Sequence, residues 1–145
     1  MTLTLRPATE ADADDIAALF RASRALLTFM PELHTAAEDR DYVGVLIATQ
    51  RVTVAEREGR LAGFMAEHDG WINQLYMAPD ALRSGGGSAL LAAAKSRNDS
   101  LELWCFLDNH RAQAFYEKHG FAAAEVTDGS TNEARLPDIR YRWTR

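Results

Sequence analysis

The chain has 145 residues, of which 47% are hydrophobic and 26% charged, and this composition is typical of a soluble globular protein with one domain over residues 1–145. Its formal net charge of -5, without a dense Lys/Arg cluster, argues against binding to nucleic acid. The single cysteine, Cys105, excludes an internal disulfide, and its apolar surroundings in the sequence predict an inert, buried thiol. The N-terminus lacks an apolar signal core and no run approaches ~20 apolar residues, so we expect a cytoplasmic protein that does not bind membranes.

The first half of the chain predicts one strand, two helices and an antiparallel meander. Alternating side chains over Leu3–Arg6 indicate a strand that stops at Pro7. Thr9 and Thr35 each stand three positions before an acidic residue, which predicts the N-terminal caps of two helices. Three strands follow, with turns at Glu58-Gly59 and Asp69-Gly70: Arg51–Glu56, Leu61–Glu67 and Trp71–Met77.

The second half predicts two helices that alternate with three strands. The first of these helices is a run of small helix formers directly after the three glycines Gly85 to Gly87. The remaining elements are a buried strand over Leu101–Phe106, a helix over Asn109–His119, a strand beginning at Phe121 and a last strand over Leu136–Trp143. The whole order is β-α-α-β-β-β-α-β-α-β-β.

The stretch Leu75–Ala94 joins a strand, a glycine-rich turn and a helix. Glycine lets the backbone come close to a ligand, and the first amides of a helix have no partner within the helix, so this arrangement favours an anion such as a phosphate or pyrophosphate. No lysine follows the glycines as in a Walker loop, and three consecutive glycines do not supply G-x-G-x-x-G, so a nucleotide-binding switch or NTPase is weakly supported. A plain turn before a packed helix is the other interpretation.

Two motifs resemble those of one known family. The R-S-G-G-G-S of Arg83–Ser88, after its apolar strand, resembles the acyl-CoA-binding motif [QR]-x-x-G-x-[GA] of the GCN5-related N-acetyltransferases, the GNAT family. Gly85 and Gly87 take the two glycine positions, whereas Leu82 stands where the family has Gln or Arg. The segment Asp108–Phe121, DNHRAQAFYEKHGF, is similar to the family element N-x-x-[AS]-x-x-x-Y-x-x-x-G-F.

The resemblance implies a fold and a co-substrate. The fold is α/β (α+β), with a mixed, mostly antiparallel seven-stranded sheet, about four flanking helices and a splay between the fourth and fifth strands that admits the CoA molecule. The co-substrate is acetyl-CoA, and we expect no metal, because the chain has no His and carboxylate pair with zinc spacing. The implied contacts are the loop residues Arg83, Ser84, Gly85, Gly86, Gly87 and Ser88, the main chain of Leu75, Tyr76 and Met77, and Asn109, which is also a good helix N-cap.

The resemblance further implies an acetyl transfer to a primary amine by direct attack in a ternary complex. Such a reaction needs a proton acceptor for the amine, a donor for the oxyanion and an acid for the leaving thiolate. Tyr116 aligns with the family tyrosine beside the CoA sulfur, although its spacing alone also fits a buried core tyrosine. The alternative is a catalytically idle acyl-CoA-binding or regulatory module, which Leu82 and the absence of a clear base keep open.

Several assignments stay open in the sequence. Candidate proton acceptors are Glu67, His68, Glu102 and a chain of water, whereas Asn73 and Gln74 lie on the right strand but cannot act as bases. The family commonly lines its acceptor pocket with the region of Met30, Glu32 and His34, which makes these residues candidates for substrate contact, although we favour ordinary loop residues there. The identity of the amine acceptor is not determined. The aromatic residues Trp71, Tyr76 and Trp104 could shape a pocket, but because they lie in strands we expect them in the core. A strand edge near the C-terminus is a possible homodimer contact.

Overall fold

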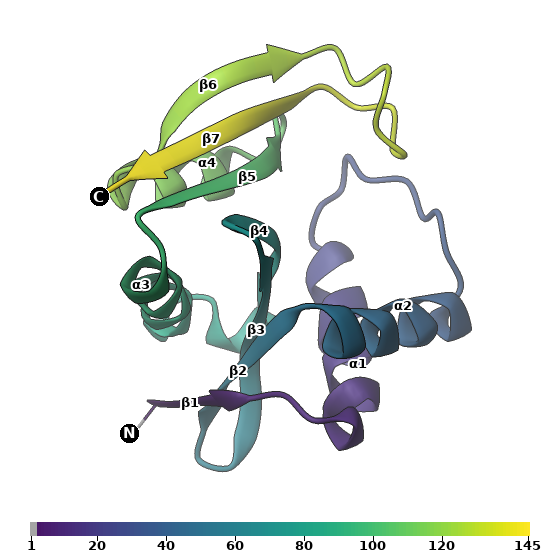
Figure 1. Cartoon of the computed structure of the whole chain (residues 1–145). Helices are drawn as coiled ribbons and strands as arrows, with labels where there is room; N and C mark the ends of the chain where they lie inside the picture. Colours follow the sequence, from purple (N-terminus) through teal and green to yellow (C-terminus); the bar gives the residue numbers. More distant parts are fainter. Residues whose placement is uncertain (1–2) are drawn as a thin grey trace.

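The computed structural model describes residues 3–145 and contains a single seven-stranded sheet with four helices (Figure 1). In chain order the elements are β1 Leu3–Pro7, α1 Ala13–Arg24, α2 Ala36–Thr49, β2 Arg51–Arg57, β3 Arg60–His68, β4 Trp71–Met77, α3 Gly86–Arg97, β5 Ser100–Phe106, α4 His110–Lys118, β6 Ala122–Thr127 and β7 Asp138–Thr144. Short 3-10 turns cover Glu10–Asp12 and Pro79–Ala81. The predicted fold class and element order are confirmed.

The sheet is antiparallel except at one junction. Its strand order is β1-β2-β3-β4-β5-β7-β6, and β4 and β5 are the only parallel neighbours among the strands of residues 3–145. These two strands pair at a single position, Trp71 opposite Glu102, where the Glu102 amide donates to the Gly70 carbonyl at 2.9 Å. Beyond that point they diverge, so the sheet opens between β4 and the group formed by β5, β7 and β6 (Figure 1).

Local side-chain bonds fix where the first two helices begin. At Thr35 the predicted capping box is present, because the Thr35 hydroxyl accepts from the Glu38 amide at 3.2 Å and the Thr35 amide donates to the Glu38 carboxylate at 2.9 Å. The predicted cap at Thr9 begins a 3-10 turn instead, and α1 starts only at Ala13. The Arg6 guanidinium donates two hydrogen bonds of 2.8 Å to the Asp12 carboxylate, and these hydrogen bonds hold the pKa of Asp12 far below its usual range.

Helices cover both faces of the sheet and create two hydrophobic clusters. Helices α1 and α2 pack on one face of β2 and β3, with a cluster that includes Ile16, Phe20, Val43, Leu46, Val54 and Phe64. Helices α3 and α4 lie against the other face, with a cluster that includes Met65, Leu90, Leu91, Leu103, Tyr116 and Tyr141. Because this second cluster contains residues from β3, β4, β5 and β7, it joins the two parts of the sheet across the opening.

The aromatic residues of the strands are less buried than the sequence analysis expected. Trp104 is 44% exposed, since it alternates with the buried Leu103 and Cys105 and lies on the opposite face of β5. The prediction of a core position for Trp104 is therefore wrong, and Trp71 and Tyr76 are only half-buried.

The outer strands present the sheet's edges. Strand β6 forms the C-terminal edge, and its residues Ala122 to Val126 are exposed; the homodimer contact expected near here stays a prediction. None of the helices within residues 3–145 combines the length and apolar character that a membrane crossing requires.

Candidate active site

The opening between β4 and β5 leaves backbone groups of β4 without a strand partner. The Ala78 amide donates to the Ala62 carbonyl at 2.8 Å, and Tyr76 lies opposite Phe64 in the same register. Because the backbone groups of an antiparallel strand alternate between its two edges, those of Tyr76 face β3, and those of Leu75 and Met77 face the opening. The Met77 carbonyl is occupied there by the hydroxyl of the buried Ser23, at 2.6 Å.

The start of α3 lies against the end of β4 and against α4. Gly85 is the N-cap and has φ +86, in the left-handed region that glycine adopts without strain. Gly86 and Gly87 already belong to the first helical turn, so only one of the three glycines precedes the helix. A Cβ on Gly86 would lie 2.3 Å from Cε of Met77, and one on Gly87 would lie 3.3 Å from the Phe115 ring.

The first amides of α3 face outward with few partners. The Gly86 amide donates to the Ser84 hydroxyl at 3.2 Å, whereas within residues 3–145 no hydrogen bond is found for the amides of Gly87 and Ser88. Arg83 is exposed beside them, and so is Leu82, at 40%. The loop predicted as an anion site therefore combines two free amides, the positive end of a helix dipole and a cation.

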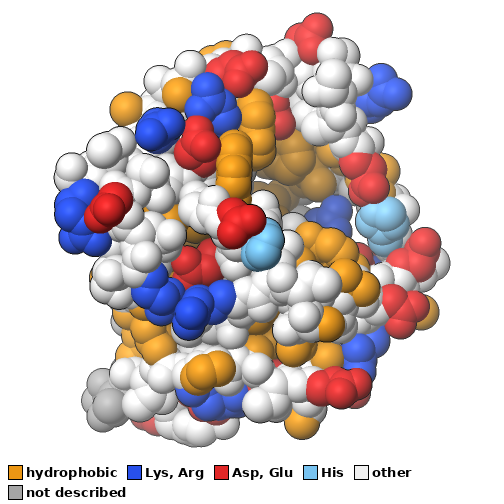
Figure 2. All heavy atoms as spheres, viewed as in Figure 1, with side chains coloured by type: hydrophobic (Ala, Val, Ile, Leu, Met, Phe, Trp, Pro, Cys, Tyr) orange, Lys and Arg blue, Asp and Glu red, His pale blue; other side chains and the backbone are white. Residues whose placement is uncertain are grey.

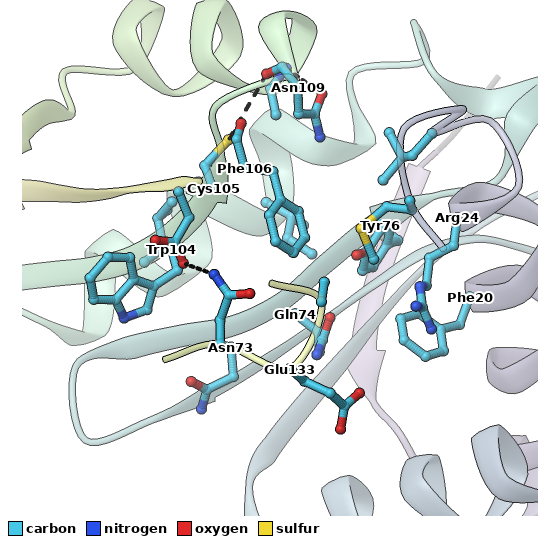
Figure 3. A pocket seen from close by; sticks show the side chains of 18 of the residues that line it. Phe20, Arg24, Asn73, Gln74, Tyr76, Trp104, Cys105, Phe106, Asn109 and Glu133 are labelled. Carbon is cyan, nitrogen blue, oxygen red and sulfur yellow. Dashed lines mark hydrogen bonds between the residues drawn. The ribbon is translucent and has the colours of Figure 1, made fainter. Parts of the chain in front are cut away.

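A cavity of about 880 Å³ extends from this opening into the molecule. Its walls come from α1, the loop between α1 and α2, β4, β5, α4 and the loop between β6 and β7 (Figure 3). In the space-filling view the surface is hollowed between the two parts of the sheet, and hydrophobic side chains line much of the hollow (Figure 2). Leu75, Tyr76, Asn109 and Tyr116, which the sequence analysis singled out, all contribute to the walls.

Tyr116 combines burial with a hydroxyl on the cavity wall. Its side chain is 8% exposed and packs edge-on against Phe115 and Phe121, with ring centroids 5.3 and 5.7 Å away. No hydrogen bond of the hydroxyl is found among the described residues. Burial raises its pKa far above the usual value, so Tyr116 keeps its proton throughout the neutral range. Burial likewise raises the pKa of the neighbouring Cys105 thiol to about 12, in agreement with the predicted inert cysteine.

Asn109 caps α4, as predicted. Its Oδ1 accepts from the Ala112 amide at 3.2 Å, while the residue also lines the cavity. No partner of its Nδ2 group is found within residues 3–145, so this donor remains for a molecule in the cavity.

The side chains considered as proton acceptors have other partners. Glu67 is buried and bonded to Arg97 and Asn98, and Glu102 is bonded to Arg140 at 2.5 Å. Neither carboxylate lines the cavity. Asn73 and Gln74 do line it, and Gln74 donates to the Tyr42 hydroxyl at 2.9 Å.

The loop whose residues were candidates for acceptor contact lies beside the cavity. Met30 and His34 line it, whereas Glu32 faces a smaller neighbouring cavity of about 550 Å³. His34 Nε2 lies 2.6 Å from a carboxylate oxygen of Glu133, so the loop between α1 and α2 meets the loop between β6 and β7. Sequence analysis missed Glu133 and the cavity residue Arg24, since no local pattern brings segments so distant in the sequence together.

The geometry agrees with comparisons to known proteins. Residues 48–123 match a family model described as an acetyltransferase (GNAT) domain, which is more than half of the chain. The chain therefore belongs to the GNAT family of acetyltransferases, and this confirms the family and the class of enzyme that the two motifs predicted.

Individual known proteins are similar to the chain in sequence or in fold. The chain is 30% identical to the peptidyl-lysine N-acetyltransferase YiaC of Escherichia coli (strain K12) over 98 residues, which span 67% of this chain and 66% of that protein. A GCN5-related N-acetyltransferase from Rhodopseudomonas palustris superposes with a TM-score of 0.83 at 24% identity, over 100% of this chain and 97% of that one. The PaiA N-acetyltransferase of Thermoplasma acidophilum, solved in complex with coenzyme A, superposes with a TM-score of 0.75 at 16% identity over the full length of both chains.

Among residues 3–145 no cluster of three or more His, Cys, Asp or Glu side chains has an arrangement that could hold a metal ion.

Proposed function

We propose that the chain transfers an acetyl group from acetyl-CoA to a primary amine, by direct attack within a ternary complex. The observation that carries the proposal is the opening of the sheet. It lets Leu75 and Tyr76 of β4 and the protonated Tyr116 face one cavity, while the start of α3 packs against Met77 at the end of β4, outside the residues that line the cavity.

The residues around the opening suit the parts of a CoA molecule. The free amides of Gly87 and Ser88, with the Arg83 side chain, hold the pyrophosphate, and Gly85 leaves room for it because nothing lies within 4 Å of the place where a Cβ would stand. Ser84 supports this loop through its bond to Gly86.

The pantetheine arm extends along β4. It bonds the outward backbone groups of Leu75 and the Met77 amide, the side chain of Tyr76 forms part of the wall, and Asn109 Nδ2 supplies a further donor. The exposed Leu82 offers no hydrogen bond at the position where the family has Gln or Arg, so the main-chain amides provide most of the binding.

The transfer needs no nucleophile from the protein. The neutral amine attacks the thioester carbonyl, so that a C–N bond forms and the C–S bond breaks, while the Leu75 amide donates to the oxyanion. Tyr116 gives its proton to the departing thiolate, and the proton that the attacking nitrogen loses returns to Tyr116 through water in the cavity. Glu67, His68 and Glu102 do not line the cavity, so none of them takes the proton of the ammonium group directly, and water in the cavity carries this proton away before the attack.

The first experiment is calorimetric titration with acetyl-CoA, CoA and ATP in parallel, followed by a thiol-release screen of amines. We expect micromolar binding of both CoA species, no binding of ATP, and thiol release with at least one amine. The name of the YiaC relative makes a lysine peptide one member of the panel. Binding without turnover would support the idle acyl-CoA-binding module instead, and absence of binding would contradict both functions.

A further inference from the structure

Arg24, the last residue of α1, lies on the cavity wall with unused hydrogen-bond donors. Its side chain is 17% exposed, and its guanidinium carbon stands 5.0 Å from the centre of the Phe20 ring. No hydrogen bond of this guanidinium is found within residues 3–145. Figure 3 shows it beside Phe20, on the other side of the cavity from Trp104 and Cys105.

The nearest acid forms an ion pair with Arg24 but no hydrogen bond. Asp39 is buried, and its Oδ1 is 3.8 Å from Arg24, too far for a hydrogen bond. Its Oδ2 is bonded to Arg21 at 2.6 Å, and Arg21 also holds the exposed Glu32 at 3.0 Å. Asp39 is therefore hydrogen-bonded to Arg21, and Arg24 makes only a longer ion pair with it, so that the N–H groups of Arg24 remain without a hydrogen-bond acceptor among the described residues.

Stacking leaves the donors of Arg24 available. A guanidinium lies on an aromatic ring through its flat face, whereas its five N–H groups point outward in the plane of the group. Among the described residues no side-chain nitrogen is both buried and without a partner, so the N–H groups of Arg24 are open to the cavity, where a ligand can accept from them. The planar fork fits a carboxylate, which it can hold through two parallel hydrogen bonds.

We propose that Arg24 binds a carboxylate of the acceptor, so that the preferred acceptor is a small amino acid rather than an amine without an anionic group. This inference rests on the proposed acetyl transfer. Tyr76 lies beside Phe20, with ring centroids 5.2 Å apart, and both rings line the cavity. They form an apolar wall for the stem of the acceptor, whose carboxylate lies at Arg24 and whose amine points toward the thioester.

The test compares matched acceptors. The probes are amino acids of increasing length, from glycine to 6-aminohexanoate, each paired with the amide of its carboxyl group, and thiol release from acetyl-CoA is measured. We expect at least one acid to have a KM about 10- to 100-fold below that of its amide, the usual worth of a charge-assisted hydrogen bond. Equal KM values for every pair, or faster acetylation of a lysine peptide without a free carboxylate, would overturn the inference.

Variants separate this inference from the proposed function. Arg24→Met should abolish the preference for the acid, Arg24→Lys should retain part of it, and Arg60→Met, which alters an exposed arginine at the start of β3, should keep it in full. Saturation-transfer NMR of each probe with CoA present reports binding without turnover, and calorimetry with acetyl-CoA checks that each variant is folded. If the acids bind through Arg24 but no thiol is released, the proposal of acetyl transfer is wrong and the proposal of a carboxylate site at Arg24 is supported. If each acid and its amide bind with equal affinity, the proposal of a carboxylate site at Arg24 is wrong, whether or not acetylation occurs.

Discussion

The hydroxyl of Tyr116 has two properties that a general acid needs, since it faces the cavity and burial keeps it protonated. We predict that Tyr116→Phe lowers kcat about 100-fold or more, which is the usual contribution of a positioned acid. The dissociation constant of acetyl-CoA should change less than threefold, about 0.6 kcal/mol, because the ring and its packing remain. Steady-state kinetics and calorimetry measure the two quantities.

Tyr141→Phe is the matched control. Its side chain is also buried, yet its hydroxyl donates to the Glu117 carboxylate at 2.7 Å and Tyr141 does not line the cavity. We expect this variant to lose about 1 kcal/mol of unfolding free energy, the ordinary worth of a hydrogen bond, with nearly unchanged kcat. Equal losses of kcat in both variants would mean that removing either buried hydroxyl disturbs the structure, and the acid role of Tyr116 would be wrong.

At the scale of elements, the start of α3 depends on a glycine with positive φ. Gly85 has φ +86, and an added Cβ there would meet no protein atom but would stand in the space proposed for the pyrophosphate. We predict that Gly85→Ala costs about 1 kcal/mol of stability through backbone strain and also weakens acetyl-CoA binding about tenfold or more. Thermal unfolding and calorimetry provide the readouts.

A second glycine separates the two effects. Gly59, in the turn between β2 and β3, has φ +74 and equally open surroundings, but it lies away from the cavity. Gly59→Ala should therefore cost similar stability and leave acetyl-CoA affinity unchanged. If both variants bind acetyl-CoA like the parent protein, the pyrophosphate does not lie at Gly85.

The contact between His34 and Glu133 joins two loops at the cavity and should depend on pH. The hydrogen bond to Glu133 raises the pKa of His34 above its ordinary value of 6.5. A pKa raised in the folded state means that the bond is fully formed below pH 6.5 and is lost as the pH rises through the raised pKa. We predict that proton NMR places the pKa of His34 above 6.5, and that Glu133→Gln moves it back toward 6.5.

His119 serves as the internal reference in the same spectra. Its pKa is lowered by burial and by the nearby Lys95 and Lys118, so it should titrate below 6.5 in both proteins. A His34 pKa that does not respond to Glu133→Gln would mean that the loops do not touch in solution.

Local patterns predicted the elements well, because caps, turns and alternation depend on neighbouring residues. The strand Trp71–Met77 has the predicted bounds, and the Thr35 cap is present. Alternation does not indicate which face of a strand a helix will cover, and so the exposure of Trp104 was missed. The part of the cavity wall around Arg24 forms only when distant segments fold together. The same holds for the contact between His34 and Glu133, which are 99 positions apart in the sequence.

At the scale of the whole molecule, the two parts of the sheet meet in one strand pair and a shared hydrophobic cluster, so a ligand between them should bind to both. At an acetyl-CoA concentration 100 times the dissociation constant, binding should raise the free energy of unfolding by about 2.7 kcal/mol. For a chain of this size we expect the midpoint of thermal unfolding to rise by about 5–10 °C. A parallel scan with ATP is the control and should show no rise.

Hydrogen exchange can locate that stabilisation on β4 itself. The amides of Leu75 and Met77 face the opening, whereas those of Gln74 and Tyr76 are paired with β3, so adjacent residues of one strand serve as site and control. We predict fast exchange at Leu75 and Met77 in the free protein and slow exchange at Gln74 and Tyr76. Acetyl-CoA at 100 times its dissociation constant should slow the first pair by up to about a hundredfold, because exchange then requires release of the ligand. If acetyl-CoA slows all four amides equally, it stabilises the fold without lying along β4, and the proposed position of the pantetheine arm is wrong.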